Sequence, residues 1–314
     1  MTGFNAIQAV LLIPLGAVFV LALLPGYRLT AALNVLASLA TLLAALSLFV
    51  ARPAEGQLLF VDDLNVVFIA LNTLVGFTTS VFSASYIAHE LETGRLTPTY
   101  LRFYHAMYQA MMFGMNLALL ANNIGLLWVA VELATLTTVL MVGIYRTHEA
   151  LEAAWKYFIL GSVGIALALF GTILVYVAAQ PEIGEGLDAM TWTILIQRAI
   201  AFDPALLNVA FVFLLLGYGT KVGLAPVHAW LPDAHAEGPT PISAVLSGLL
   251  LNVALYAVLR FKMLMSANGA AIAPGPLMVT MGLTSLIFAA FMLYRRRDIK
   301  RLFAYSSIEH MGII

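Results

Sequence analysis

The sequence contains no cysteine, and charged side chains make up only 10% of its 314 residues. Thiolate-bound iron–sulfur clusters, covalent c-type haem and disulfides all require cysteine, so this chain can hold none of them. A soluble domain carries about 25% charged residues. The formal net charge of −1 provides no basic surface for nucleic acid and no acidic tail. We therefore expect a chain that neither binds nucleic acid nor carries electrons itself.

Hydrophobic residues account for 62% of the chain and the mean hydropathy is +0.97, which indicates an all-α polytopic membrane protein in the lipid bilayer. A spanning helix needs about 20 mainly apolar residues. Nine segments reach that length: 5–24, 29–50, 64–88, 103–121, 124–145, 153–178, 205–225, 241–262 and 275–294. A tenth begins near Leu302 and reaches Ile314 after about 13 residues, too few to cross a bilayer. The sequence therefore predicts the N-terminal part of a longer protein.

The distribution of arginine and lysine predicts the orientation of the helices. Loops on the side opposite the N-terminus hold nine basic residues: Arg28, Arg95, Arg102, Arg146, Arg295, Arg296, Arg297, Lys300 and Arg301. Loops on the N-terminal side hold four: Arg52, Arg198, Arg260 and Lys262. Because basic loops stay in the cytoplasm, we expect a plasma-membrane protein with its N-terminus outside. The acidic stretch 181–203 then lies outside as a surface connection.

The most polar interruption of this apolar pattern is the stretch 216–241, LGYGTKVGLAPVHAWLPDAHAEGPTP. Pro226 lacks an N–H and its ring clashes with the carbonyl four residues earlier, so the helix that carries Lys221 should kink or open there. An ionisable group at a broken membrane helix indicates a functional site. Burial disfavours a charged lysine and a nearby carboxylate favours it, so Lys221 could exchange its proton if its partner moved.

Glu132 lies about eight residues into the fifth segment, roughly 12 Å deep at 1.5 Å per residue. A carboxylate at that depth costs on the order of 2.5–3.5 kcal/mol, so it should face the bundle interior and find a partner. The threonines below it could hold water: Thr135, Thr137 and Thr138. The alternative is that Glu132 only anchors helix packing.

Two further residues allow two interpretations each. Lys156 follows Glu152 by four positions, the favourable order for a helical ion pair. It either takes part in proton transfer or extends from the end of the sixth helix toward water. Asn252 is the strongly polar residue of the eighth segment. It either bonds to a neighbouring helix or hydrates a path, but it cannot titrate.

Histidines flank the predicted break and suit a proton relay, because their pKa values lie near neutrality. They are His228 and His235. Their spacing beside Asp233 and Glu237 matches no recognised metal motif, so we expect no bound metal.

A second pair of ionisable residues, Glu309 and His310, lies about two turns inside the tenth segment and favours a proton path over packing. His105 and His228, from different segments, leave open a haem held by two histidines. We otherwise expect no cofactor.

Two blocks carry a resemblance to a known family: KVGLAPVHAWLPDAHAEGPTPISAVLSG (221–248) and RRDIKRLFAYSSIEHMG (296–312). With them, nearly the whole chain resembles the antiporter-like membrane subunits shared by respiratory complex I, Mrp sodium/proton antiporters and membrane-bound nickel–iron hydrogenases. The segment 149–176 and the Glu309–His310 pair are most similar to component F of hydrogenase 4.

The resemblance implies an antiporter-like helix bundle of about fourteen helices with inverted five-helix repeats and a discontinuous seventh helix. Residues 1–102 would hold helices 1–3, 103–262 the first repeat, and 275–314 the start of the second, so about nine and a half helices would be present. The functional pair falls on Glu132 and Lys221, and the sixth-helix lysine on Lys156. Asn252 stands where a lysine is often found, which puts a titrating relay there in doubt.

The function implied is proton translocation in a redox-driven membrane complex, of the hydrogenase or formate hydrogenlyase type. The partners would be other membrane subunits and, through them, peripheral redox subunits. The alternatives are a complex I subunit, an Mrp-type cation/proton antiporter subunit that could carry sodium, and a non-pumping membrane scaffold. The sequence shows no nucleophile, base and oxyanion arrangement of an enzyme active site.

Overall fold

The computed structural model describes residues 6–294 and 298–314, and the predicted apolar segments form helices in it. The α-helices are α1 (Ala6–Leu23), α2 (Tyr27–Ser47), α3 (Asp63–Glu92), α4 (Pro98–Leu120), α5 (Ile124–Val142), α6 (His148–Ile183), α7 (Trp192–Arg198), α8 (Pro204–Val222), α9 (Leu231–Glu237), α10 (Thr240–Val245), α11 (Leu251–Ala267), α12 (Pro274–Leu293) and α13 (Ile299–Ile313). A π-helical turn, Leu246–Leu250, joins α10 to α11 into one rod. The all-α prediction is confirmed.

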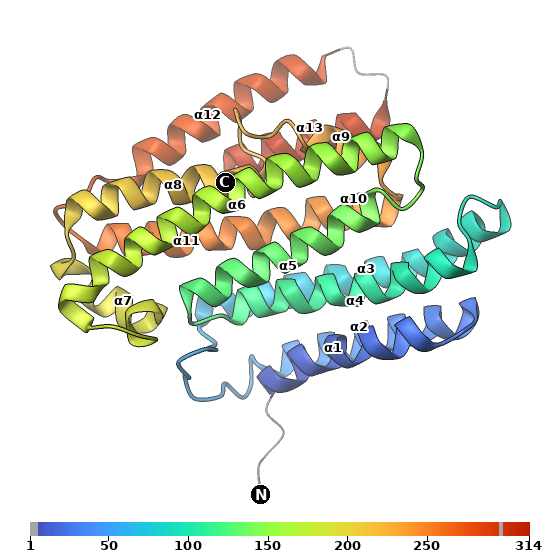
Figure 1. The fold of residues 1–314 in the computed structure, drawn as a ribbon, viewed down its shortest axis with the longest axis horizontal. Helices are drawn as coiled ribbons and strands as arrows, with labels where there is room; N and C mark the ends of the chain where they lie inside the picture. Colours follow the sequence, from blue (N-terminus) through green and yellow to red (C-terminus); the bar gives the residue numbers. More distant parts are fainter. Residues whose placement is uncertain (1–5, 295–297) are drawn as a thin grey trace, which may run out of the picture.

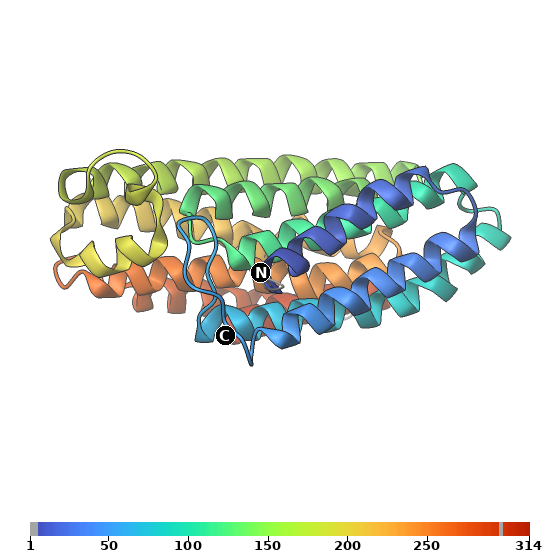
Figure 2. The ribbon, with the colours of Figure 1, turned by 90° about the horizontal axis from the view of Figure 1, so that it is seen from below.

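The long helices run roughly parallel or antiparallel and form an elongated bundle (Figures 1 and 2). Within the described residues, eight are long and apolar enough to cross a membrane: α1, α2, α3, α5, α6, α8, the α10–α11 rod and α12. Figure 1 shows α1 and α2 at one edge of the bundle and α12 at the other. The described part of the chain therefore carries most of the predicted spans as helices.

Helix α4 lies among these spans but is more polar than they are. Its 23 residues are about 35 Å long, enough to cross. Two of its buried polar side chains are paired: Gln109 donates to the Asn34 side chain at 2.8 Å, and Asn116 accepts from Asn72 at 2.8 Å. Because such pairs satisfy polar groups that lipid cannot, α4 fits the interior of the bundle beside α1 and α5.

Helices α6 and α8 make the most extensive contact in the bundle. Glycines allow their backbones to approach closely. A Cβ atom at Gly217 would lie 2.5 Å from the backbone nitrogen of Ala168 and 2.7 Å from the Gly164 oxygen. This small-residue contact holds the helix that carries Lys221 against α6.

The predicted break in the seventh span is confirmed. Helix α8 ends at Val222, and Gly223 follows in the left-handed conformation with φ 80°. The N–H of Leu224 closes the end by bonding to the Gly219 carbonyl at 2.9 Å. Pro226 lies in the following non-helical stretch, and the short helix α9 then continues the span. Lys221 is thus in the last turn of α8, immediately before the break.

Three expectations about the helix ends are wrong. Helix α6 is 36 residues long and begins at His148, so Lys156 lies two turns inside it. The stretch 181–203 is more than a surface connection, because α7 lies within it and buries Trp192 against Phe60, with ring centroids 5.8 Å apart. Helix α11 extends to Ala267, so Arg260 and Lys262, counted as loop residues, belong to a helix.

Candidate functional site

The centre of the candidate site is the fully buried side chain of Lys221. Its Nζ atom donates a hydrogen bond to Thr135 Oγ1 at 2.8 Å and lies 3.8 Å from Glu132 Oε2. Glu132 and Thr135 stand on the same face of α5, three residues apart. The structure therefore brings together the carboxylate and the lysine that the sequence singled out, and adds a hydroxyl that holds the ammonium.

Helix α6 leaves room for this ammonium group. A Cβ atom at Gly161 would lie 2.9 Å from Lys221 Nζ, so glycine is what lets the side chain extend toward α5. The ring of Tyr157, one turn earlier on α6, lies 5.9 Å from Nζ and adds a cation–π contact. The Tyr157 hydroxyl bonds to Thr138 at 2.7 Å.

A stacked aromatic pair closes the site toward the helix break. The rings of Tyr157 and Trp230 are 4.3 Å apart and nearly parallel. The Trp230 indole donates to the carbonyl of Thr220 at 2.7 Å, which satisfies a carbonyl freed by the end of α8. Tyr157 and Trp230 escaped the sequence analysis, because aromatic residues in an apolar chain give no distinguishing signal.

The contact between Lys221 and Glu132 is loose for an ion pair. At 3.8 Å the two atoms are beyond hydrogen-bonding distance, and Glu132 Oε2 has no hydrogen-bond partner among the described residues. The Glu132 side chain is 19% exposed, whereas that of Lys221 is fully buried. The lysine thus depends on a carboxylate that has room to move.

Lys156 lies in a separate cluster of ion pairs around α9. Its Nζ contacts Glu152 at 2.7 Å and Asp233 at 3.0 Å. Arg301 of α13 binds the other oxygen of Asp233 at 3.1 Å and lies 3.8 Å from Glu237. Asp233 therefore connects α9 to both α6 and α13. From the sequence, it was weighed only as a possible metal ligand.

His235 and His310 line a cavity of about 550 Å³ between the α9–α10 segment and α13. His235 is buried, and its Nε2 has no hydrogen-bond partner among the described residues. Lys300 also lines the cavity and donates to the carbonyls of Ala236 and Gly238 at the end of α9. Of the four predicted relay residues, His228, His235, Glu309 and His310, two therefore line this cavity: His235 and His310.

The other two relay residues, His228 and Glu309, are not among the residues that line the cavity. His228 packs against the ring of Phe288 on α12, with centroids 4.2 Å apart, and its Nδ1 lacks a hydrogen-bond partner within the described ranges. Glu309 is only half-buried, and His310 is exposed, with its Nδ1 2.6 Å from the Ser306 carbonyl. In the part of the chain that the structure describes, the Glu309–His310 pair therefore lies on the outer side of α13.

Asn252, for which the sequence left open a bond to a neighbouring helix or the hydration of a path, makes a hydrogen bond within its own rod. Its Nδ2 donates to the carbonyl of Gly248 at 2.7 Å, within the same rod. That carbonyl belongs to the π-helical turn, which shifts the backbone hydrogen bonds by one residue. Asn252 therefore supports an irregular turn of the helix.

In residues 6–294 and 298–314, no group of three or more His, Asp and Glu side chains is placed to hold a metal ion. The histidines of the haem alternative lie against different helices. His105 of α4 contacts the rings of Tyr27 and Tyr104, whereas His228 contacts Phe288. The structure does not bring the two together.

A buried ion pair at the α7 end of the bundle was missed entirely. Arg260, only 2% exposed, binds both oxygens of Asp62 at 2.7 Å and lies 4.3 Å from the Trp192 ring. Asp62 also accepts the backbone N–H of Asn65 at the start of α3. Burial acts to raise the pKa of Asp62, but the hydrogen bonds from Arg260 and Asn65 lower it below the usual range. The pair locks α3, α7 and α11 together.

Comparison with known proteins identifies the family to which the region around Glu132 and Lys221 belongs. The family described as NADH:quinone oxidoreductase/Mrp antiporter, transmembrane region, matches residues 121–314, which include both residues. The chain belongs to this family. The resemblance expected from the sequence is therefore confirmed, and both blocks that carry it lie within the matched region.

Two relatives show how the similarity extends along the chain. A hydrogenase-4 component F homolog of Methylacidiphilum infernorum is 63% identical over 306 residues, covering 98% of this chain and 64% of the relative. The NAD(P)H-quinone oxidoreductase chain 4 of Gloeobacter violaceus is 33% identical over 213 residues, covering 68% of this chain and 39% of that protein. The similarity to the hydrogenase component therefore extends over the whole chain.

Two solved structures share the fold. A chain of the archaeal membrane-bound sulfane sulfur reductase aligns with a TM-score of 0.84 at 22% identity, covering 98% of this chain and 63% of that one. A chain of respiratory complex I from Thermus thermophilus aligns with a TM-score of 0.78 at 24% identity, covering 98% and 62%. This chain spans less than two thirds of the length of these proteins, and the antiporter-like fold is confirmed.

Proposed function

We propose that the chain is part of a proton-translocating membrane subunit of a redox-driven complex, and that Lys221 carries the proton. The observation that carries the proposal is the burial of Lys221 at a helix break, with Glu132 3.8 Å away. The 63% identity to a hydrogenase-4 component F homolog favours a hydrogenase or formate hydrogenlyase type of complex over a complex I type. Other membrane subunits would then be its partners.

The loose pair provides a means of controlling the proton. Two unit charges about 4 Å apart interact by on the order of 4 kcal/mol at an effective dielectric constant of about 20. Moving a charge through 100 mV costs about 2.3 kcal/mol. If Glu132 moves away, the buried ammonium loses a stabilisation of that size and favours release of its proton. The interaction energy of the pair and the energy of moving a charge through the membrane potential are therefore of the same order.

The proposed path uses the unpartnered histidines and the cavity beside α9. Along the chain, His228 precedes Trp230 and His235 follows it in α9. Glu309 and His310 lie on α13. Lys156 would act through Asp233, which holds α9 in place. Residues 103–262 would form the first of two inverted repeats, with the N-terminus outside the cell.

The test is proton uptake by the complex that contains the full protein, reconstituted in liposomes. Lys221→Ala and Glu132→Ala should abolish or strongly reduce proton translocation. Lys262→Ala, which removes an exposed lysine of α11, is the control and should leave translocation unchanged. Full translocation by Lys221→Ala at a normal rate of electron transfer would refute the assignment.

The same liposomes distinguish the alternatives. An Mrp-type antiporter would exchange sodium for protons without an electron donor, which the same assay measures in sodium and potassium media. A scaffold would leave the pH gradient unchanged during turnover.

A further inference from the structure

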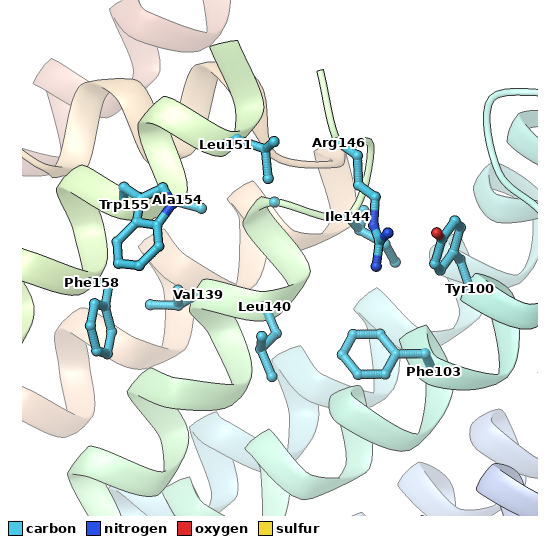
Figure 3. A pocket seen from close by; sticks show the side chains of 11 residues that line it. Tyr100, Phe103, Val139, Leu140, Ile144, Arg146, Leu151, Ala154, Trp155 and Phe158 are labelled. Atoms are coloured by element: carbon cyan, nitrogen blue, oxygen red, sulfur yellow. The ribbon is translucent and has the colours of Figure 1, made fainter. Parts of the chain in front are cut away.

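An apolar groove opens on the surface of the bundle where α4 begins, α5 ends and α6 begins (Figure 3). Its volume of about 610 Å³ lies within the roughly 300–1,000 Å³ typical of small-molecule sites. Aromatic and aliphatic side chains form its walls, among them Phe103, Leu140, Trp155 and Phe158. Trp155 is 62% exposed and Leu140 51%, so the groove is open to the surroundings of the chain.

Arg146 brings a positive charge to this groove. It lies in the turn between α5 and α6, and Figure 3 shows its side chain directed toward Tyr100 at one end of the lining. Its guanidinium carbon is 4.5 Å from the centre of the Tyr100 ring. None of the ion pairs formed by the described residues includes Arg146. The groove therefore combines an apolar wall with a cation that no carboxylate neutralises.

The backbone of Arg146 is unusual as well. Its φ of 54° is the left-handed conformation, and Arg146 is the one non-glycine residue with positive φ in the described ranges. A Cβ atom disfavours this conformation, so glycine or asparagine would suit the turn better. An arginine in this disfavoured backbone conformation points to a use for its side chain.

We propose that this groove binds an anionic phospholipid, with the phosphate at Arg146 and an acyl chain along Leu140, Trp155 and Phe158. The groove lies where two spanning helices end and begin, which is the level of lipid headgroups. An exposed tryptophan at that level fits the interfacial belt of membrane proteins. Basic pockets between helix ends bind anionic headgroups. The site does not depend on the proposed proton translocation.

The experiment measures lipid binding to the detergent-purified complex by native mass spectrometry. The probe is palmitoyl-oleoyl phosphatidylglycerol, with the zwitterionic phosphatidylcholine of the same chains as comparison. Arg146→Gly removes the cation and relieves the backbone, whereas Arg146→Lys keeps a charge. Arg28→Gln removes another exposed arginine of the same membrane side, away from the groove lining. A photoreactive benzoylphenylalanine at Leu140 reports what occupies the groove.

Phosphatidylglycerol should bind more tightly than phosphatidylcholine, and Arg146→Gly should weaken it about fivefold, the factor for about 1 kcal/mol per basic residue near the surface. Arg146→Lys should retain most of the binding, and Arg28→Gln all of it. The thermal midpoint of Arg146→Gly should not fall, because glycine adopts φ 54° freely. Equal binding by Arg146→Gly, an equal loss in Arg28→Gln, or a protein adduct at position 140 would each overturn the proposal.

Discussion

Replacing Lys221 with methionine separates a proton-carrying role from a packing role. Methionine is unbranched and flexible, so it can occupy the channel that Gly161 leaves beside α6. It cannot carry a proton. If Lys221 only anchors helices, its replacement should lower the stability. If Lys221 carries protons, its replacement should abolish proton translocation whether or not the stability changes.

The contacts set the expected stability. Methionine removes a hydrogen bond from a charged donor to Thr135, about 1.5–3 kcal/mol, and a loose contact with Glu132. It also removes the desolvation cost of the buried ammonium, which is several kcal/mol. Thr135 keeps its own bond to the Val131 carbonyl at 2.9 Å, and Glu132 retains some exposure. These terms are of similar size, and Glu132 is 19% exposed and stays hydrated, so the free energy of unfolding should remain within about 1 kcal/mol of the wild-type value and should not fall by the roughly 3–5 kcal/mol lost when a fully buried charge loses its partner.

The assay combines thermal unfolding in detergent with proton translocation and electron transfer in liposomes. Lys221→Met should unfold at nearly the same temperature as the wild type and translocate no protons. Lys262→Met is the matched control for an exposed lysine. A variant that loses about 2 kcal/mol of stability while pumping normally would show that Lys221 is a packing residue, and the reasoning would be wrong.

Three further predictions concern Gly161, Asp62 and Asp233. Gly161→Ala places a Cβ atom 2.9 Å from the flexible end of Lys221, so liposome assays should show less proton translocation with little change in thermal midpoint. Asp62→Asn leaves Arg260 unpaired and should cost about 3 kcal/mol in unfolding experiments at neutral pH. Because the Asp62 pKa is lowered in the folded state, the ion pair's contribution is complete above about pH 4 and is lost at lower pH, where wild type and variant should converge. Asp233→Asn breaks contacts with two cations and should speed hydrogen exchange in α9, whereas unchanged exchange would show that α9 is held by packing.

The sequence predicted the part of the site that depends on local chemistry. Pro226 and the glycines around Lys221 specify a helix end whatever lies next to them, so the break appeared where it was expected. The pairing of Lys221 with Glu132 followed from the family resemblance, and the cost of burying either charge alone agreed with it. Thr135 was recognised as polar, but its role as the hydrogen-bond acceptor of Lys221 depends on how α5 and α8 face each other.

Residues whose role depends on distant partners could not be predicted. Arg260 looked like the basic end of a span, because nothing near it in sequence reveals Asp62, which lies 198 positions away. Asp233 gave no signal either, since its two cations come from α6 and α13. The face of α13 on which Glu309 lies could not be predicted either, because the apolar pattern of the tenth segment does not say which face is covered. In each case the missing information was the packing of one helix against another.

The charged side chains on the two sides of the α8–α9 break are held with different strengths, and this difference suits a switch. Asp233 binds two cations at 3.0 and 3.1 Å, and Lys300 donates to the last carbonyls of α9. On the other side, Lys221 has one hydrogen bond and a carboxylate at 3.8 Å. A displacement of α13 would therefore be transmitted to α9 through Arg301 and Asp233, whereas the weak contact between Lys221 and Glu132 is free to change. The distance between Lys221 Nζ and Glu132 Oε2 governs the charge of Lys221, and it is thus the distance that costs least free energy to change.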